Sequence, residues 1–310
     1  MKQNSFVSHL TSRGWDKNAA MRLFESDLIN DCLTLEQWRK SLVGVFCSRN
    51  KSLGALHHLS QFLKKDVPEW SDLTKPNISE YKEYLLLNVS RNSASTYLHQ
   101  LAAVMSIYED ELPASNYRSV MQLRGEPSQH VALSEEEVER IHRYTPRTKV
   151  EADIKRSFML ECLCGARSCD IPSLTESNIR DGWLTYISQK TKTETSVPVH
   201  RYLLDYLAMP TSKEKYQRAV ICKTIKRICK HCGINTLVKI FTKGQWVTKE
   251  KWALVGSHTA RRSFATQLAL RGVPVPTISK LMGHSNTKMT SRYICIDNKD
   301  IGDKALAFFS

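Results

Sequence analysis

The sequence predicts a mainly α-helical protein with a small antiparallel sheet, built as a helical N-terminal domain followed by a mixed α+β domain. Three observations support this fold class. Apolar residues recur at helical spacing through the N-terminal half, a polar stretch with Gly125 and Pro127 interrupts that pattern, and residues 183–199 alternate as a β-hairpin does. At 310 residues, with 41% hydrophobic residues, the chain is long enough for two domains with cores of their own.

Three blocks of the N-terminal half predict helices. The first spans residues 35–63 and is closed by Val67-Pro68, and the second runs from about 79 to 87. The third spans 93–108 and carries Tyr97, Leu101 and Tyr108 on one side. These blocks predict a bundle of amphipathic helices.

A domain boundary is predicted where the polar stretch ends. Residues 124–131 read RGEPSQHV, which favours a linker. Ser134 is followed three residues later by Glu137, the pattern of a capping box that opens a helix. We therefore place the N-terminal domain at 1–123, the linker at 124–133 and the C-terminal domain at 134–310.

The C-terminal half mixes helix and strand. A helix from about Ile154 is expected to end at Gly165, because glycine suits the left-handed position after a helix. In the hairpin, Pro198 indicates an edge strand, since proline cannot donate to a sheet ladder. Its tip, around 191–195, is polar.

The charge favours a polyanionic partner. Forty-five Lys and Arg against thirty-one Asp and Glu leave a net charge of +14, and each phosphate that a basic side chain neutralises releases counterions. Residues 213–251 are the most basic window, with eleven Lys and Arg and two acids. Phosphate contact explains this window, and a solvated helix face is the alternative.

Other function classes find little support in the sequence. No apolar run reaches the roughly 20 residues of a membrane helix, and the N-terminus lacks the pattern of a signal peptide. Nine cysteines, an odd number, indicate reduced thiols and a cytoplasmic protein. Cys229 and Cys232 resemble half of a zinc site, but no second pair follows at finger or ribbon spacing. There is no P-loop and no carboxylate triad for two Mg²⁺ ions, so no cofactor is predicted.

Four short motifs carry candidate chemistry, and each has an ordinary alternative. His258 and Arg261 lie three apart after Ser257, a candidate N-cap, so they share a helix face at its positive end and suit a phosphate or oxyanion. Such a pair is often mere surface. Arg167 follows the helix that ends at Gly165, where an arginine commonly caps carbonyls. Lys190 lies near the hairpin tip, where a lysine is usually just solvated.

The fourth motif is Leu281-Met-Gly283-His284. A short helix from about Pro276 is expected to stop at Gly283, which holds His284 at a tight corner; a capping or core histidine is the alternative. Ser285 or Asn286 then begins another helix, and Tyr293 is expected two turns along it on the side of Met289. A tyrosine there would most often be a packing residue.

Taken together, the four motifs resemble the tyrosine recombinase (phage-type integrase) family. That family has an arginine in a GxRxxE/D box, a hairpin lysine, HxxR, and GHS with a tyrosine nine residues after the histidine. Here these read GARSCDI, SQKTK, SHTARRSFAT and LMGHSNTKMTSRY. The match covers residues 130–300. The N-terminal half looks like the family's helical core-binding (SAM-like) domain on pattern and length alone.

The resemblance implies a set of catalytic roles. Tyr293 would attack a DNA phosphate to form a 3′-phosphotyrosyl bond and release a 5′-hydroxyl. Arg167 and Arg261 would hold the non-bridging oxygens, and His284 would add a third donor.

Proton transfer falls to the remaining residues of the motifs. Lys190 would protonate the leaving oxygen, with Lys192 as the alternative on the same strand face. His258 would assist proton transfer from Tyr293, and Asp170 would orient the site. The resemblance implies that this chemistry needs neither metal nor ATP.

The resemblance also implies partners and an architecture. Two domains would grip double-stranded DNA as a C-shaped clamp, and four protomers would act on two DNA sites, with accessory DNA-bending proteins as possible helpers. The apolar tail 305–309 would dock on a neighbouring subunit, or alternatively pack on its own domain. We expect the integrase of a mobile element. The alternatives are an invertase or resolvase, a type IB topoisomerase, a non-catalytic DNA-binding protein and a metal-dependent nuclease.

Overall fold

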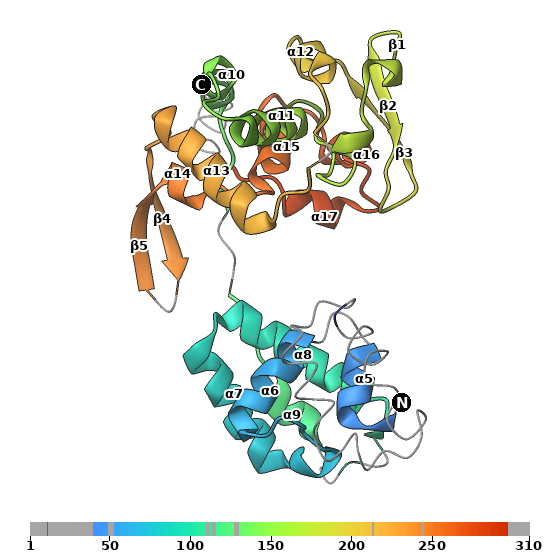
Figure 1. Cartoon of the computed structure of the whole chain (residues 1–310), viewed down its shortest axis with the longest axis vertical. Coiled ribbons are helices and arrows are strands. Elements are labelled where there is room, and N and C mark those ends of the chain that lie inside the picture. Colours follow the sequence, from blue (N-terminus) through green and yellow to red (C-terminus); the bar gives the residue numbers. More distant parts are fainter. Residues whose placement is uncertain are drawn as a thin grey trace, which may run out of the picture. The chain divides into compact units, whose positions relative to one another are not determined.

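The computed structural model of the chain describes residues 11, 40–48, 53–109, 112, 116–126, 130–212, 214–242 and 245–296 (Figure 1). Contacts divide the chain into two compact units, Met1–Ser128 and Gln129–Ser310. The first is helical and the second combines helices with two small antiparallel sheets, so the predicted fold class is confirmed. The domain limits 1–123 and 134–310 and the clamp stay predictions, and the tail 305–309 lies outside the described residues.

The N-terminal unit packs its described helices around one apolar core. These are α5 (Leu42–Ser48), α6 (Leu53–Leu63), α7 (Lys75–Asn88), α8 (Arg91–Met105) and α9 (Tyr117–Met121), with a 3₁₀ turn η1 (Trp70–Asp72). Phe46, Tyr81 and Leu98 are fully buried at its centre. The second predicted helix begins earlier than expected, because the Thr74 hydroxyl accepts from the Asn77 N–H and Pro76 occupies the first turn.

The first two helices of the C-terminal unit follow the sequence signals. Helix α10 (Glu135–Arg143) begins with the predicted capping box between Ser134 and Glu137. Helix α11 (Lys149–Cys164) starts five residues before the expected Ile154, because Thr148 caps it. It ends as predicted at Gly165, whose φ is +63°. Short 3₁₀ turns η3 (Ile171–Ser173) and η4 (Glu176–Asn178) follow.

The predicted hairpin is two strands of a three-stranded sheet. Strands β1 (Ile179–Arg180), β2 (Trp183–Ile187) and β3 (Glu194–Pro198) pair in that order, and β2 pairs with β3 from Trp183–Pro198 to Ile187–Glu194. Strand β3 is at the edge, where Pro198 costs no ladder bond. Leu184 and Val197 face the core, so this hairpin is packed.

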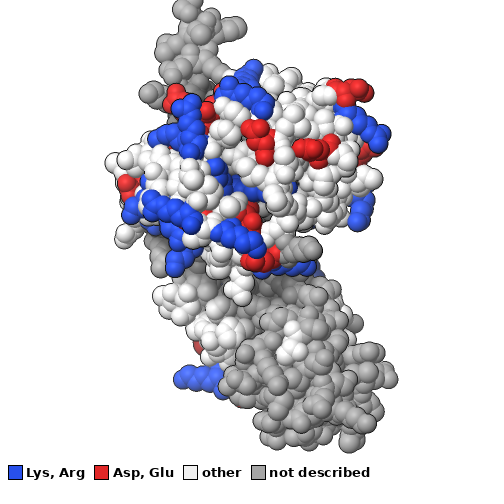
Figure 2. All heavy atoms as spheres, turned by 45° about the horizontal axis from the view of Figure 1, so that its top comes forward, with Lys and Arg blue, Asp and Glu red and all other residues white. Residues whose placement is uncertain are grey.

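The basic window contains an element that the sequence did not predict. After α12 (Leu203–Ala208) and α13 (Arg218–His231), strands β4 (Leu237–Thr242) and β5 (Gln245–Glu250) form a second hairpin, followed by α14 (Lys251–Leu254). Figure 1 shows this hairpin standing out from the body of its unit beside α14. On the face drawn in Figure 2, Lys and Arg side chains form several groups with Asp and Glu among them.

The last three described helices carry the remaining motifs. They are α15 (Thr259–Leu270), α16 (Val275–Leu281) and α17 (Thr287–Ser291). The N-cap of α15 is His258 and not Ser257. Asn286 caps α17 as predicted, but this helix ends at Ser291, so the expectation that Tyr293 lies within it was wrong. Among the described residues, no helix is long and apolar enough to cross a membrane.

Candidate active site

Arg261 is the buried centre of the site. Its side chain is 1% exposed, and its guanidinium joins two helix ends by donating from Nη1 to the carbonyl of Gly165 and from Nη2 to that of Met282. The same Nη2 lies 2.8 Å from Nε2 of His284. Within the described part of the chain, Nε of Arg261 has no hydrogen-bond partner. Arg261 therefore binds the α11–η3 corner to the α16–α17 corner.

Arg167 contacts the same α16–α17 corner. Its Nη2 donates to the Gly283 carbonyl at 3.0 Å, and its Nη1 donates to the Ser188 hydroxyl at 2.8 Å. Gly283 has a φ of +59°, and a Cβ there would lie 2.7 Å from Oγ1 of Thr195 and 3.7 Å from Nη1 of Arg167. The glycine thus allows α16, β3 and Arg167 to meet closely.

Asp170 orients Arg167 through an intermediate that the sequence did not reveal. Its Oδ2 accepts from the Ser188 hydroxyl at 3.1 Å and its Oδ1 from the Gln189 N–H at 2.8 Å. Asp170 and Ser188 are fully buried. Ser188 therefore links the carboxylate, Arg167 and the turn of the β2–β3 hairpin. A serine in a polar turn gives no such signal in the sequence.

The two arginines of the site have no directly paired carboxylate among the described residues, since Asp170 reaches Arg167 only through the Ser188 hydroxyl. Burial, with repulsion from Arg167, lowers the pKa of Arg261. Glu161 lies near Arg261, but burial raises the pKa of this carboxyl to about 8, so it is largely protonated at neutral pH. Among the described residues, no carboxylate forms an ion pair with Arg167 or Arg261. Two guanidiniums held together without a carboxylate favour a bound anion.

His284 is held as a neutral imidazole. Burial and the two arginines lower its pKa to about 4. Its Nδ1 lies 2.9 Å from Oγ1 of Thr290, and its Nε2 faces a guanidinium that can only donate. Without an anion, Nε2 therefore accepts from Arg261. A bound phosphate would favour the protonated ring, which can donate.

Tyr293 lies beside this cluster just after α17. Its N–H donates to the Thr290 carbonyl at 2.8 Å. Its half-buried ring lies 5.2 Å from the His284 ring, centroid to centroid, and 5.6 Å from the guanidinium carbon of Arg261. Thr266 fixes the chain here, since its hydroxyl accepts from the Cys295 N–H at 2.9 Å. The site thus brings Arg167, Arg261, His284 and Tyr293 together.

His258 and Lys190 lie at the edge of the cluster. Burial first, and then the charges of Arg262, Arg218, Arg261 and Lys190, lower the pKa of His258. Lys190 and Lys192 are both exposed in the turn that hydrogen bonds between Ser188, Lys192 and Thr193 close. Lys190 is the one whose charge acts on His258.

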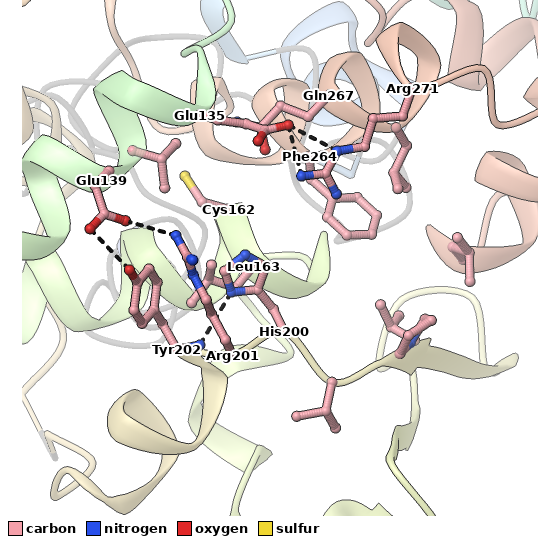
Figure 3. A pocket seen from close by; sticks show the side chains of 16 residues that line it. Glu135, Glu139, Cys162, Leu163, His200, Arg201, Tyr202, Phe264, Gln267 and Arg271 are labelled. Atoms are coloured by element: carbon pink, nitrogen blue, oxygen red, sulfur yellow. Dashed lines mark hydrogen bonds and ion pairs between the residues drawn. The ribbon is translucent and has the colours of Figure 1, made fainter.

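A separate cavity of about 500 Å³ lies between α10, α15 and the segment after β3 (Figure 3). None of the six predicted catalytic residues lines it. Its charged lining is paired, because Arg271 contacts Glu135 while Arg201 and Tyr202 contact Glu139. The predicted catalytic residues therefore lie at or beside the Arg167–Arg261 cluster and not in this cavity.

The half zinc site suggested by the sequence acquires no further ligands. Cys229 is buried in α13 and Cys232 is the C-cap of that helix. In the described ranges, no group of three or more His, Cys, Asp or Glu is placed to hold a metal ion. Cys232 instead points its thiol at the Arg140 carbonyl.

Comparison with known proteins identifies the class to which this fold and cluster belong. The model of the phage integrase family matches residues 132–299. This is more than half of the chain, so the chain belongs to the phage integrase family, and the resemblance seen in the motifs is confirmed.

The individual relatives share low sequence identity with this chain. Tyrosine recombinase XerA of Pyrococcus furiosus is 25% identical over 185 residues, which are 55% of this chain and 59% of that protein. The chain spans less than two thirds of the length of the curated relatives that it matches first.

Solved structures show the same fold over most of the chain. A XerH site-specific recombinase bound to a palindromic difH substrate has a TM-score of 0.60 at 15% identity, covering 99% of this chain and 94% of that one. A lambda integrase tetramer bound to a Holliday junction has a TM-score of 0.57 at 16% identity, covering 86% of this chain and 78% of that one.

Proposed function

We propose that the chain is a site-specific DNA recombinase that breaks and rejoins DNA through a covalent bond between Tyr293 and a phosphate. One observation carries the proposal: two guanidiniums without a direct carboxylate partner lie around an imidazole, with the Tyr293 ring 5.6 Å from the guanidinium carbon of Arg261. This arrangement suits a phosphodiester held beside a phenolic nucleophile.

The first step is the attack of the Tyr293 oxygen on the phosphorus. The bond to the 5′-oxygen breaks, and the 3′-phosphate remains on the tyrosine. Arg167 and Arg261 hold the non-bridging oxygens and stabilise the charge of the transition state. His284, held against Arg261, gains a proton as the phosphate binds and becomes a third donor.

Proton transfer completes the step. His258 has a lowered pKa, so it is available as a neutral acceptor for the Tyr293 proton. Lys190 gives a proton to the leaving 5′-oxygen. A second 5′-hydroxyl reverses the reaction on the phosphotyrosyl bond, which conserves the energy of the broken phosphodiester. In this mechanism the residues of the chain perform each step, and none passes through a metal or ATP.

The proposed chemistry also implies the partners of the chain. We propose double-stranded DNA as the substrate, four copies of the chain on two DNA sites, and action in the cytoplasm; the fold shared with a lambda integrase tetramer on a Holliday junction supports the assembly. The proposed biological role is integration of a mobile element. Accessory DNA-bending proteins and docking of the tail 305–309 on a neighbouring copy complete the proposal.

A nicked suicide substrate tests the chemistry. Nicked duplexes that cover the DNA flanking the gene are incubated with the full chain. The products are then examined for protein–DNA adducts that survive denaturation. The wild type is expected to form an adduct at one position with or without EDTA, and Tyr293→Phe is expected to bind that DNA without an adduct. Adducts from Tyr293→Phe, or cleavage that EDTA abolishes, would overturn the proposal.

Rearrangement assays separate the biological roles. The mapped site is placed on two molecules, or twice on one plasmid in direct or inverted orientation. Joining of the two molecules supports an integrase, while deletion or inversion alone indicates a resolvase or an invertase. Relaxation of a plasmid without any site, with no exchange of partners, would indicate a topoisomerase instead.

A further inference from the structure

The β4–β5 hairpin is firmly attached at its base. The Lys251 N–H donates to the Thr236 carbonyl at 2.8 Å and the Trp252 N–H to that of Ile234 at 2.9 Å. The ring of Trp252 lies 4.9 Å under Nζ of Lys230, and Lys251 forms an ion pair with Glu137 at 2.6 Å. Ile234 and Val255, on either side of the base, are fully buried. The hairpin therefore starts from a rigid platform.

Beyond this base, the described residues of the hairpin form no core of their own. Residues Leu237, Lys239 and Phe241 share one face with Trp246 and Thr248, since Phe241 pairs with Trp246 and Lys239 with Thr248. Leu237 is 68% exposed and Trp246 57% exposed. An isolated two-stranded hairpin is marginal in water, and exposed apolar side chains on such an element indicate a binding surface.

The chemistry of this surface is basic and aromatic. Lys239 lies with Nζ 5.3 Å from the Trp246 ring, and Lys249 is exposed on the opposite face. The acid of the hairpin, Glu250, accepts from Nε1 of Trp252 at the base. Lysines on both faces, with an exposed indole on the Lys239 face, complement a polyanion better than they complement an apolar or basic protein surface.

We propose that the β4–β5 hairpin is a ribbon that binds duplex DNA in the major groove beside the cleaved phosphate. A major groove is about 12 Å wide and admits a two-stranded ribbon. Two strands of six residues, paired at about 4.8 Å, reach roughly 20 Å. Lysines of the hairpin meet the phosphates at the groove edges, and Trp246 contacts base edges or thymine methyl groups.

The position of the hairpin in the chain places its base close to the N-terminus of α15. Strand β5 ends at Glu250, and only α14 and a short loop separate it from His258, the N-cap of α15. Val255 in this connection is fully buried, so the base of the hairpin is attached to the same core as α15. The inference rests on the proposed function, since it assumes that DNA occupies the Arg261–Tyr293 cluster.

A triple variant tests the ribbon. Lys239→Ala/Trp246→Ala/Lys249→Ala removes two cations and one exposed indole from the hairpin. The control, Arg143→Ala/Lys149→Ala/Trp183→Ala, removes two exposed cations and a 46% exposed indole elsewhere in the same unit. Both full-length proteins are compared with wild type on a duplex that contains the mapped cleavage site.

Two measurements report on the contact. The slope of log affinity against log salt is expected to become shallower by about 2 in the hairpin variant, because each lost phosphate contact removes about 0.9. Protection of guanine N7 from methylation, which reads the major groove, is expected to disappear over one short stretch beside the cleavage site. The control is expected to keep that protection.

Adduct formation separates the two proposals. The ribbon is supported if the hairpin variant still forms the adduct at saturating concentration but no longer protects the short stretch of guanines. An adduct with unchanged protection and unchanged slope rejects the ribbon and leaves the recombinase standing. Unchanged protection with loss of assembly on DNA would show that the hairpin contacts a second copy, which also rejects it. Absence of any wild-type adduct rejects the recombinase itself.

Discussion

The two hairpins of the C-terminal unit show how differently the same element is used. In β2–β3, Leu184 and Val197 are buried, and the turn is tied to Arg167 and Asp170 through Ser188. In β4–β5, Leu237 and Trp246 are exposed, and the hairpin is held at its base. A lysine on the packed hairpin can be aimed at one atom, while a lysine on the exposed hairpin supplies charge over a wider area.

The largest difference between the two hairpins is expected in how the loss of a lysine changes the rate of strand cleavage. Lys190→Ala should slow strand cleavage by about 10²–10⁴-fold, because the leaving oxygen loses its proton donor, and Lys249→Ala should leave the cleavage rate of bound DNA nearly unchanged. Single-turnover cleavage of saturated substrate measures both.

A substrate with sulfur in place of the leaving 5′-oxygen sharpens this test, because a thiol of pKa about 8.5 leaves without a donor. The sulfur substrate should restore the Lys190→Ala rate. If Lys192→Ala shows the loss and the rescue instead, Lys192 is the acid.

Two leucines make the same comparison for stability. Leu184→Ala empties a fully buried site and should lower the free energy of unfolding by about 2–5 kcal/mol. Leu237→Ala changes a 68% exposed side chain and should alter it by less than about 0.5 kcal/mol. Urea unfolding of both variants checks this, and equal losses would mean that β4–β5 is packed.

Ser188 tests the link between the packed hairpin and the guanidinium site. Ser188→Ala removes the hydroxyl that joins Arg167 to Asp170, and cleavage should slow by about 10–100-fold, or roughly 1.4–2.8 kcal/mol. Because the residue acts through Arg167, the loss should appear in the cleavage rate with little change in DNA affinity. Ser188→Thr keeps a hydroxyl and should recover part of the rate. A full rate in Ser188→Ala would show that Arg167 needs no such support.

His284, at the corner against which β3 packs, should make the stability of the fold modestly dependent on pH. The pKa of His284 is lowered to about 4 in the folded chain, so between about pH 6.5 and 4 the unfolded chain binds a proton that the folded chain does not. Stability therefore falls as the pH drops through this range. His284→Gln should flatten the fall, measured as urea midpoints at several pH values. An unchanged slope would mean that His284 is not held neutral.

Local signals predicted the parts of the fold that local chemistry determines. The capping box at Ser134, the left-handed Gly165 and the edge position of Pro198 follow from single residues and near neighbours. The β4–β5 hairpin was missed because its lysines extend the basic run of α13, which masks the strand alternation.

Long-range contacts determined the rest. Tyr293 leaves α17 because Thr266, 27 residues earlier, accepts from Cys295 and holds the chain out of the helix. Ser188 is polar, lies in a turn and is fully buried by partners distant in sequence. The sequence motifs predicted the residues of the cluster, while the hydrogen bonds that hold these residues together are visible only in the structure.

The most direct test is the chemical identity of the protein–DNA bond. Full-length protein trapped on the nicked substrate is digested, and the nucleotide-bearing peptide is sequenced by mass spectrometry. We expect one modified residue, Tyr293, joined to the 3′-phosphate of the cleaved strand, with the 5′-hydroxyl free. A nucleotide on another residue, or a 5′-phosphate link, would contradict the proposal that Arg167, Arg261, His284 and Tyr293 act on one phosphorus.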